Sequence, residues 1–369
     1  MSLQQPAFDL PDFPWDSLAG ATERARAHPD GIVDLSVGTP VDPVPEVVRA
    51  ALAGPAADEP GYPTTHGPLA LRTAIAGSLD RRFGVTVDPQ AVLPTIGSKE
   101  LVAWLPTLLG LGAGHTVLIP ELAYPTYEVG VRLARATAIR SDAVTAVGPG
   151  RVSLIWVNSP SNPTGRVLPA EHLAKVVEFA RERGAVVASD ECYLSLSDGA
   201  PSILSPEVCG GSFDGLLAVH SMSKTSNLAG YRAGFVTGDP TLVAGLLEVR
   251  KHAGMIVPRP VQAAMAAAAD DDAHVTAQVA VYARRRETLR AAVEKAGLRV
   301  EHSNAGLYLW ATADEPGRRT VERLAELGIL VAPGEFYGPA GAQYVRIGLT
   351  ASDERIAAAA ERLAGNTLG

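Results

Sequence analysis

Residues 151–190 read RVSLIWVNSPSNPTGRVLPAEHLAKVVEFARERGAVVASD, and this stretch decides the fold class. Two short apolar runs, 151–157 and 185–189, flank a helical candidate at 169–183. Continuous runs of Val, Ile, Leu and Ala separated by helices are typical of parallel sheets, because such strands are buried on both faces. We therefore predict an α/β fold with a mostly parallel central sheet and helices on both of its faces.

The same alternation extends along most of the chain. Further helices are expected at 67–83, 98–109, 125–136, 261–269 and 281–296, and further strands at 91–95, 115–119, 215–220 and 233–237. From residue 298 the pattern changes to a smaller α+β unit, with strands at 298–301, 306–311 and 344–349 and helices at 319–327 and 352–364. Sheets of the first kind bind ligands beyond the carboxyl ends of their strands, so polar residues at those ends are the candidates for function.

Charge and cysteine content narrow the function class. Lysine and arginine number 32 and aspartate and glutamate number 40, which gives a net charge of −8. That balance argues against a general affinity for nucleic acid or for anionic membranes. Two cysteines, Cys192 and Cys209, are too few for a disulfide framework or a zinc site, so no metal is expected. The run Arg284 to Arg286 is read as a solvated helix face.

No segment reads as a membrane anchor or an export signal. The most apolar window, 101–120, is interrupted by Pro106, Gly110 and Gly112, which favours helix, turn and strand over a membrane span. The first sixteen residues lack a basic region followed by an apolar stretch. At about 100–200 residues per domain, 369 residues suggest two or three packed units. We expect a soluble cytoplasmic protein.

The segment 220–232, HSMSKTSNLAGYR, carries the strongest chemical signal and follows a predicted buried strand. Lys224 could be a surface lysine on a polar loop. Alternatively, it is an amine nucleophile beside a phosphate site made by Ser221, Ser223 and Arg232, since hydroxyls and a guanidinium suit phosphate oxygens.

Three other segments place polar groups at strand ends. The segment 158–165, NSPSNPTG, is either a turn cluster or a rigid loop that holds the Asn162 amide. Asp190 ends the strand 185–189 and is either a helix N-cap or the partner of a cationic group. The segment 95–100, TIGSKE, joins a strand to a helix, whose first N–H groups could bind an anion, although its spacing is not that of a P-loop.

Taken together and in order, these motifs resemble those of the class I/II aminotransferases, the pyridoxal-phosphate enzymes of fold type I. The resemblance spans Gly38 to Arg346. Its markers are Gly38, Tyr62 with Gly67, Gly97-Ser98-Lys99, Tyr124-Pro125, Asn158 to Gly165, Asp190 with Tyr193, Ser221 to Lys224, Arg232 and Arg346. It implies an N-terminal arm in 1–43, a large cofactor domain in 44–275 and a small domain in 276–369.

The resemblance implies a role for each marker. Lys224 forms the Schiff base with the cofactor aldehyde and then moves the proton between the substrate α-carbon and cofactor C4′. Asp190 pairs with the pyridine nitrogen. The remaining cofactor contacts are Asn162 and Tyr193 on the phenolate oxygen, Tyr124 on the ring face, and Gly97, Ser98, Lys99, Ser221, Ser223 and Arg232 on the phosphate.

The same resemblance implies a homodimer and a carboxylate site. Tyr62 would reach the phosphate of the neighbouring subunit, so the active sites are shared. Arg346 would bind the substrate α-carboxylate with Gly38 and Asn162, and a surface ion pair is its alternative. The sequence departs from the aspartate-specific members in one respect, because their second arginine has no clear equivalent. The candidates for this second arginine are Arg140, Arg250 and Arg259, and none of them lies in a recognisable motif.

Two stretches, 10–16 (LPDFPWD) and 62–67 (YPTTHG), are similar to those of actinobacterial succinyldiaminopimelate aminotransferases of lysine biosynthesis. Such enzymes exchange an amino group between N-succinyl-LL-2,6-diaminopimelate and 2-oxoglutarate, giving N-succinyl-2-amino-6-oxopimelate and glutamate. An arm that packs on a second subunit would also explain 10–16. The alternatives are an aminotransferase for aspartate or another amino acid, a carbon–sulfur β-lyase using the same cofactor residues, and a ligand sensor.

Overall fold

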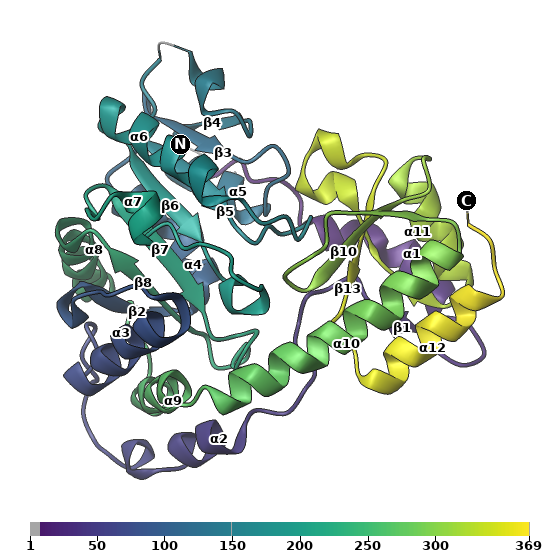
Figure 1. Cartoon of the computed structure of the whole chain (residues 1–369), viewed down its shortest axis with the longest axis horizontal. Coiled ribbons are helices and arrows are strands. Elements are labelled where there is room, and N and C mark those ends of the chain that lie inside the picture. Colours follow the sequence, from purple (N-terminus) through teal and green to yellow (C-terminus); the bar gives the residue numbers. More distant parts are fainter. Residues whose placement is uncertain (1–7, 149, 369) are drawn as a thin grey trace, which may run out of the picture.

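The computed structural model describes residues 8–148 and 150–368, which form two lobes (Figure 1). The long helix α10 (Ala273–Lys295) runs from the larger lobe to the smaller one. Among the described residues, no helix combines the length and apolar character that crossing a membrane requires. The window 101–120 forms most of α4 (Gly97–Leu108), a turn and β3 (Thr116–Ile119), as predicted.

The large lobe is built on a seven-stranded sheet. In spatial order its strands are β2 (Val92–Ile96), β8 (Ala233–Gly238), β7 (Leu216–Ser221), β6 (Val186–Asp190), β5 (Leu154–Asn158), β3 and β4 (Thr137–Arg140). The pairs from β7 to β4 are parallel, whereas β8 runs antiparallel to both β2 and β7. The predicted mostly parallel sheet is therefore confirmed. The sequence analysis missed β4, because this edge strand is partly exposed and lacks a continuous apolar run.

Helices cover both faces of this sheet, which explains why its strands are apolar throughout. In β5, Leu154 and Trp156 contact one core cluster, whereas Ile155 and Val157 contact the other. The first cluster includes α4, α5 (Thr126–Leu133) and α8 (Pro240–Ala253), and the second includes α3 (Leu69–Phe83), α6 (Ala170–Arg183) and α9 (Arg259–Asp270). The short helices α2 (Glu46–Leu52) and α7 (Pro206–Cys209) pack at the periphery, on α9 and α6 respectively.

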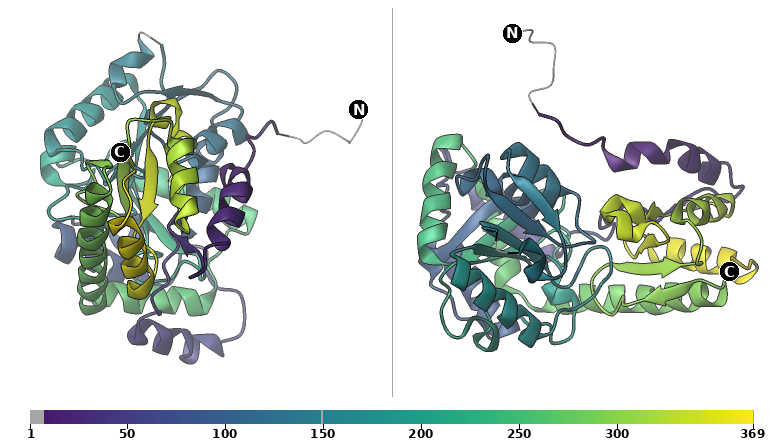
Figure 2. Two further views of the ribbon diagram at one scale, coloured as in Figure 1. Left: turned by 90° about the vertical axis from the view of Figure 1, so that its right-hand side faces the viewer. Right: turned by 90° about the horizontal axis from the view of Figure 1, so that it is seen from above.

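The small lobe combines about the last quarter of the chain with the N-terminal segment (Figure 2). Its antiparallel sheet has the order β12 (Ala332–Pro333), β13 (Val345–Gly348), β10 (Tyr308–Thr312) and β9 (Arg299–Glu301). A second, parallel pair joins β1 (Val33–Asp34) to β11 (Ile329–Leu330). The helices are α1 (Ala19–Arg26), α11 (Gly317–Glu326) and α12 (Asp353–Ala364). The three predicted strands of this unit are present, whereas the two-residue strands β1, β11 and β12 were not predicted.

The arginine run on α10 corrects one prediction. Arg284 is exposed, as expected of a solvated face, but Arg285 is only 4% exposed. Its guanidinium donates to both carboxylate oxygens of Asp42, at 2.6 and 2.8 Å, and to Asp353 at 2.6 Å. Arg286 donates to the Gly306 carbonyl. These contacts tie the chain before α2 and the start of α12 to α10.

We predict that replacing Arg285 with methionine lowers the free energy of unfolding by about 2 to 4 kcal/mol, because Asp42 is left with its charge partly buried and unpaired. The change is measured as the loss in Tm by circular dichroism at fixed protein concentration. The matched variant Arg284→Met removes an exposed guanidinium, whose nearest carboxylate, that of Asp353, lies 3.9 Å away, and should shift Tm little. Equal losses for the two variants would contradict the prediction.

Candidate active site

Polar residues end three neighbouring strands of the large sheet at the same edge. Asn158 is the last residue of β5, Asp190 the last of β6 and Ser221 the last of β7. The register pairs Asn158 directly with Asp190. Because the strands are parallel, the loops that follow them meet at one place, and that place faces the small lobe.

Asp190 is a buried carboxylate, 6% exposed, with two donors. Its Oδ2 accepts from the hydroxyl of Tyr127 at 2.8 Å, and its Oδ1 accepts from the backbone N–H of Cys192 at 3.2 Å. Burial raises the pKa of Asp190 above its ordinary value, although both hydrogen bonds oppose that rise. The helix N-cap interpretation is wrong, because Tyr193 holds the N-cap position of the short turn that follows. The carboxylate has capacity left for a cationic partner.

The amine of Lys224 lies between the two lobes and donates to the carbonyl oxygen of Gly38. Burial lowers the pKa of Lys224; Tyr308 and Cys192 oppose this, and the positive charges of Arg346 and Arg232 reinforce it. A lowered pKa increases the fraction of neutral amine, which is the form that acts as nucleophile or base. This enclosed position argues against the surface-lysine interpretation.

Arg346 is buried, at 2% exposure, without an acidic partner in the described part of the chain. Its Nη1 donates to Asn162 Oδ1 at 3.0 Å, and its Nη2 donates to the Ser36 carbonyl at 2.7 Å. The Nε atom is buried with no hydrogen-bond partner among the described residues. Arg346 is therefore not a surface ion pair. A buried guanidinium with spare donors and no counter-ion is suited to bind an anionic ligand.

The N-terminal segment contributes to the surroundings of Arg346. Trp15 donates from its indole nitrogen to the Ser36 carbonyl at 3.3 Å, and its ring lies 6.0 Å from the Arg346 guanidinium. The same ring packs on Phe336, with centroids 5.3 Å apart. Trp15 therefore packs on the small lobe of its own chain, whereas Leu10 and Phe13 of the same segment are exposed.

A second cationic region surrounds the start of α4. Gly97 begins this helix at φ +70°, and a Cβ there would overlap the guanidinium of Arg232. Gly234 of β8 is enclosed in the same way, because its Cβ would lie 2.8 Å from Ser98 N and 3.0 Å from the His220 carbonyl. The first turn of α4, Arg232 and the end of β7 are thus adjacent. Free N–H groups at a helix start beside an arginine form an anion site.

The sequence analysis gave no individual role to three residues of this site. Asn158 donates to the Asp190 carbonyl at 2.9 Å and accepts from Asn162 N–H at 2.7 Å, so it fixes two loops. Tyr127 donates to Asp190, and its ring meets that of Tyr124 edge-on with centroids 5.8 Å apart. The signal for Tyr127 was its position one helical turn after Tyr124. The third, Tyr308, has a hydroxyl 3.3 Å from that of Tyr193.

The candidates for a second substrate arginine are all occupied by protein partners. Arg250 is held by both oxygens of Glu100 at 2.8 and 3.0 Å, Arg140 pairs with Glu128 at 2.6 Å, and Arg259 pairs with Glu59 at 2.8 Å. Because each of these arginines already pairs with a glutamate of the same chain, none of the three is free to bind a substrate carboxylate there. Tyr62 is 95% exposed, so it takes no part in the buried group of its own chain.

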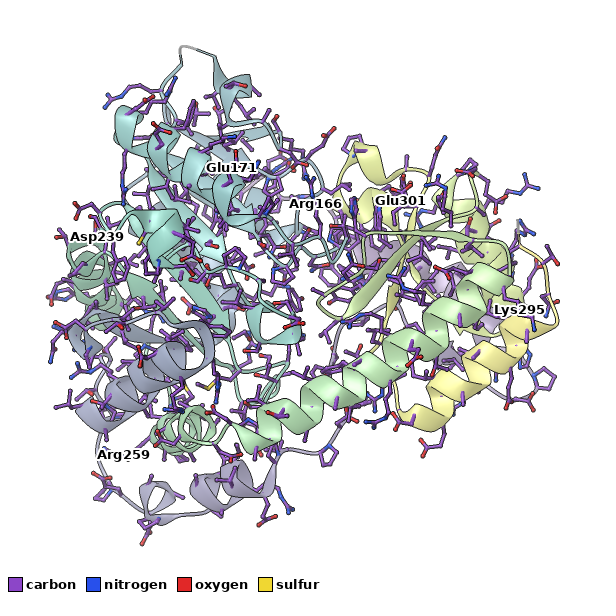
Figure 3. All side chains as sticks on the ribbon, viewed as in Figure 1. Arg166, Glu171, Asp239, Arg259, Lys295 and Glu301 are labelled. Atoms are coloured by element: carbon purple, nitrogen blue, oxygen red, sulfur yellow. The ribbon has the colours of Figure 1, made fainter. Side chains whose placement is uncertain are left out.

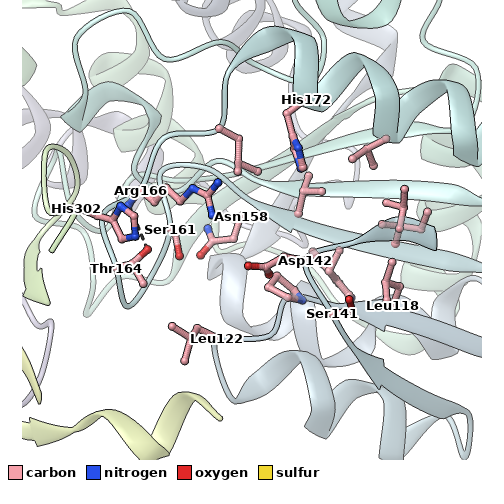
Figure 4. Close-up of a pocket in the computed structure, with 17 residues that line it drawn as sticks. Leu118, Leu122, Ser141, Asp142, Asn158, Ser161, Thr164, Arg166, His172 and His302 are labelled. Atoms are coloured by element: carbon pink, nitrogen blue, oxygen red, sulfur yellow. Dashed lines mark hydrogen bonds between the residues drawn. The ribbon is translucent and has the colours of Figure 1, made fainter. Parts of the chain in front are cut away.

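A cavity of about 180 Å³ lies beside the candidate site, on the α6 side of the sheet (Figure 4). Apolar residues of β3, β5 and α6 form its floor, and Asp142, Arg166 and His302 lie around it. Figure 3 shows Arg166 at the edge of the large lobe that faces the small lobe. Asn158 lines this cavity, whereas Lys224, Asp190 and Arg346 do not. The cavity is therefore separate from the buried charged group.

Next to Asp190, Glu191 and His220 form a buried acid–base pair. Glu191 accepts from Ile203 N–H at 2.7 Å and from the Ser202 hydroxyl at 2.8 Å, and its Oε2 lies 3.5 Å from His220 Nε2. Burial raises the pKa of Glu191 to about 7 and lowers the pKa of His220 to about 3. Both shifts favour the uncharged forms, so in slightly acidic solution Glu191 is mostly protonated and His220 is a neutral imidazole.

Comparison with known proteins identifies the family. The sequence profile described as "Aminotransferase class I and II" matches residues 30–363. The chain belongs to this family. Class I and II aminotransferases depend on pyridoxal phosphate and have the fold type I architecture, so the predicted family, fold class and cofactor are confirmed.

Individual aminotransferases match over nearly the whole chain. The probable aminotransferase Rv1178 of Mycobacterium tuberculosis is 62% identical over 96% of this chain and 85% of its own length. The 4-dedimethylamino-4-oxo-anhydrotetracycline transaminase OxyQ of Streptomyces rimosus is 60% identical over 96% of this chain and 99% of its own length. The solved structure of a probable N-succinyldiaminopimelate aminotransferase from Thermus thermophilus superposes with a TM-score of 0.85, at 29% identity, over 96% of this chain and 100% of the other.

The residues at the strand ends fit pyridoxal phosphate by their chemistry. The start of α4 and Arg232 suit the phosphate dianion, and the Arg232 guanidinium can approach the start of this helix only because Gly97 lacks a Cβ. Asp190 is a buried carboxylate that a cation would stabilise, and Lys224 is an enclosed amine. The unpartnered Nε of Arg346 leaves a donor for a substrate carboxylate. These residues are therefore chemically suited to the phosphate, the ring nitrogen and the aldehyde of the cofactor.

We predict that Glu191→Gln changes how stability depends on pH. The folded pKa of Glu191 lies above its unfolded value, so this residue stabilises the fold below about pH 4.5, and that stabilisation is lost as pH rises to about 7. Glutamine keeps the acceptor for Ile203 N–H and does not ionise. The Tm of the variant relative to the natural protein should therefore rise by several degrees between pH 5 and pH 8. Differential scanning calorimetry at both pH values measures it.

The exposed Glu178 of α6 offers the control, since Glu178→Gln removes a carboxylate without a burial cost. Its Tm difference should stay constant over the same range. A Glu191→Gln difference that is also constant, or that falls with pH, would show that Glu191 is ionised in the folded protein.

Proposed function

We propose that this aminotransferase transfers the amino group of N-succinyl-LL-2,6-diaminopimelate to 2-oxoglutarate, giving N-succinyl-2-amino-6-oxopimelate and glutamate in lysine biosynthesis. The observation that carries amino-acid chemistry is the buried Arg346, which has no acidic partner in the described residues and lies within the same charged group as Lys224. The specific substrate is supported by the resemblance of 10–16 and 62–67 to succinyldiaminopimelate aminotransferases and by the name of the Thermus relative.

The proposed assembly is a cytoplasmic homodimer. The extreme exposure of Tyr62, a large aromatic residue, supports its proposed contact with the cofactor phosphate of a second subunit. We also propose the domain division into an arm at 1–43, a cofactor domain at 44–275 and a small domain at 276–369. The separate core clusters of the two lobes support it.

The proposed cofactor contacts are those that the family resemblance implies, and the position of Asp190 and Ser221 at strand ends supports them. Asp190 would pair with the ring nitrogen, and Asn162 and Tyr193 would donate to the phenolate oxygen. Tyr124 would cover the ring face. The phosphate contacts would come from Gly97, Ser98, Lys99, Ser221, Ser223 and Arg232.

When bound, pyridoxal phosphate supplies an aldehyde that condenses with amines and a ring that withdraws electrons from the substrate α-carbon. Lys224 would take the proton from that α-carbon and return it at cofactor C4′, and the lowering of its pKa by burial favours the neutral amine that this role needs. Asp190 holds a proton on the ring nitrogen. Tyr127 and the Cys192 N–H keep this carboxylate in place and favour its charged form.

Arg346 orients the amino acid through its α-carboxylate, with Gly38 and Asn162 beside it. The guanidinium has donors left after those to Asn162 and Ser36, so it can bind both oxygens of a carboxylate. The contacts of Arg346 with the N-terminal segment and the loop after β5 fix its position before the substrate arrives. A fixed charge in a water-poor site aligns the Cα–H bond with Lys224 at little cost in reorganisation.

A second candidate acceptor is the ketone of a polycyclic molecule. It is favoured by the 60% identity to OxyQ, whose name gives a 4-oxo-anhydrotetracycline as its substrate. The two candidates differ in what Arg346 binds, because a polycyclic ketone carries no α-carboxylate. The wider alternatives are an aminotransferase for aspartate or another amino acid, and a carbon–sulfur β-lyase.

Replacing Lys224 with alanine should abolish transamination, since the variant lacks both the amine that binds the cofactor covalently and the proton carrier. Borohydride treatment of the natural protein with pyridoxal phosphate should fix the cofactor on Lys224, as read by peptide mass spectrometry. The matched variant Lys175→Ala, at an exposed lysine of α6, should keep full activity and labelling. Absence of a reduced adduct on Lys224 would refute the proposed site.

The acceptor is tested by mixing the pyridoxamine form of the enzyme with single acceptors and following the recovery of the pyridoxal absorbance. We expect fast recovery with 2-oxoglutarate and N-succinyl-2-amino-6-oxopimelate. Faster recovery with oxaloacetate, phenylpyruvate or a 4-oxo-anhydrotetracycline would instead assign one of the other acceptors. Pyruvate released from cystathionine without an acceptor would indicate the β-lyase.

A further inference from the structure

Tyr308, the first residue of β10, lies among the proposed catalytic groups but has no assigned role. It is fully enclosed, and its hydroxyl is 3.3 Å from the hydroxyl of Tyr193. The two rings meet at 74° with centroids 6.0 Å apart, so the hydroxyls approach each other without the rings stacking. The contact joins the small lobe, which carries Tyr308, to the loop after β6.

The Tyr308 side chain also contacts the residues on either side of the proposed substrate site. Its ring lies against the guanidinium of Arg346, 3.9 Å from centroid to carbon. Its hydroxyl occupies the space that a Cβ on Gly38 would need, and the carbonyl of that glycine accepts from Lys224. One side chain thus contacts Arg346, Gly38 and Tyr193.

The direction of the hydrogen bond between the two tyrosines follows from counting donors. Each hydroxyl has one proton to donate and two lone pairs. If the Tyr193 proton points to the cofactor phenolate oxygen, as proposed above, the proton between the two hydroxyls must come from Tyr308. Electrostatics favour this direction. Burial alone raises the pKa of the Tyr308 hydroxyl, but the charges of Arg346 and Lys224 and the neighbouring Tyr193 hydroxyl bring it below its ordinary value.

Burial raises the pKa of Tyr193, and the neighbouring Tyr308 adds to that rise. Tyr308 is therefore the more acidic hydroxyl and the stronger donor of the two. A hydroxyl that accepts a hydrogen bond becomes a better donor itself, because chains of hydrogen bonds polarise one another.

We propose that Tyr308 is a positioning residue that donates its hydroxyl proton to Tyr193 and so strengthens the hydrogen bond from Tyr193 to the phenolate oxygen of the cofactor. This inference rests on the proposed role of Tyr193. A stronger donor stabilises the phenolate and lowers the proton affinity of the neighbouring nitrogen that links the cofactor to Lys224. The residue thereby tunes the protonation of the bound cofactor without touching it.

The test is the pH titration of the visible absorbance of the bound cofactor in Tyr193→Phe, Tyr308→Phe and the double variant. Tyr193→Phe should raise the titration midpoint the most. Tyr308→Phe should raise it less, by about a two- to ten-fold change in the acid dissociation constant. The double variant should match Tyr193→Phe, because Tyr308 acts only through Tyr193.

The control is Tyr282→Phe, which removes a buried hydroxyl from the same core cluster and should leave the midpoint unchanged. Cofactor content and Tm are measured for each variant. Should Tyr308→Phe fold poorly, 3-fluorotyrosine placed at 308 keeps the shape and makes the hydroxyl more acidic, so the midpoint should fall.

The outcomes separate the two proposals. If Tyr193→Phe leaves the midpoint unchanged, the proposed role of Tyr193 fails and this inference falls with it. If Tyr193→Phe raises the midpoint but Tyr308→Phe does not, only the inference is overturned. Additive effects in the double variant also overturn it, because they show that Tyr308 acts independently of Tyr193. An unchanged or raised midpoint with the fluorinated residue counts against it as well.

Discussion

The hydrogen bond from Arg346 to Asn162 is the contact on which the site depends. Arg346 belongs to β13 of the small lobe and Asn162 to the loop after β5 of the large lobe, so one 3.0 Å contact joins the two. The same guanidinium holds the Ser36 carbonyl and lies on the Tyr308 ring. Burying an arginine without a carboxylate partner in the described residues is costly, and the proposed anionic substrate would offset that cost.

Much of the large lobe and of the candidate site follows from local sequence. Strands buried on both faces appear as continuous apolar runs, and the polar residues that end them must meet at one edge of a parallel sheet. This argument places Asn158 and Asp190 together, 32 residues apart in sequence, without any knowledge of the coordinates. The order of the motifs along the chain then indicates the family, which the profile match confirms.

The features that sequence reasoning missed depend on contacts between distant segments. Arg285 lies in a run of charges typical of a solvated face, yet Asp42, 243 residues away, neutralises it in the interior. Tyr308 reads as an ordinary core residue of a strand, and its importance comes from Gly38 and Arg346 beside it. The strand β4 has no apolar run, because one edge and part of its faces are open to solvent. Contacts between segments so far apart in the sequence cannot be predicted from a local residue pattern.

The pairing of β1 with β11 has a consequence for how the protein is made. Val33 leaves the ribosome early, but its partner Ile329 is translated almost three hundred residues later. Closing so long a loop is entropically expensive, and contacts of high sequence separation form slowly. The seven-stranded sheet, complete by Gly238, can assemble while the N-terminal segment still waits for its partner. The small lobe, which carries the buried Arg346, can therefore be completed only near the end of synthesis, after β11 and β13 have been translated.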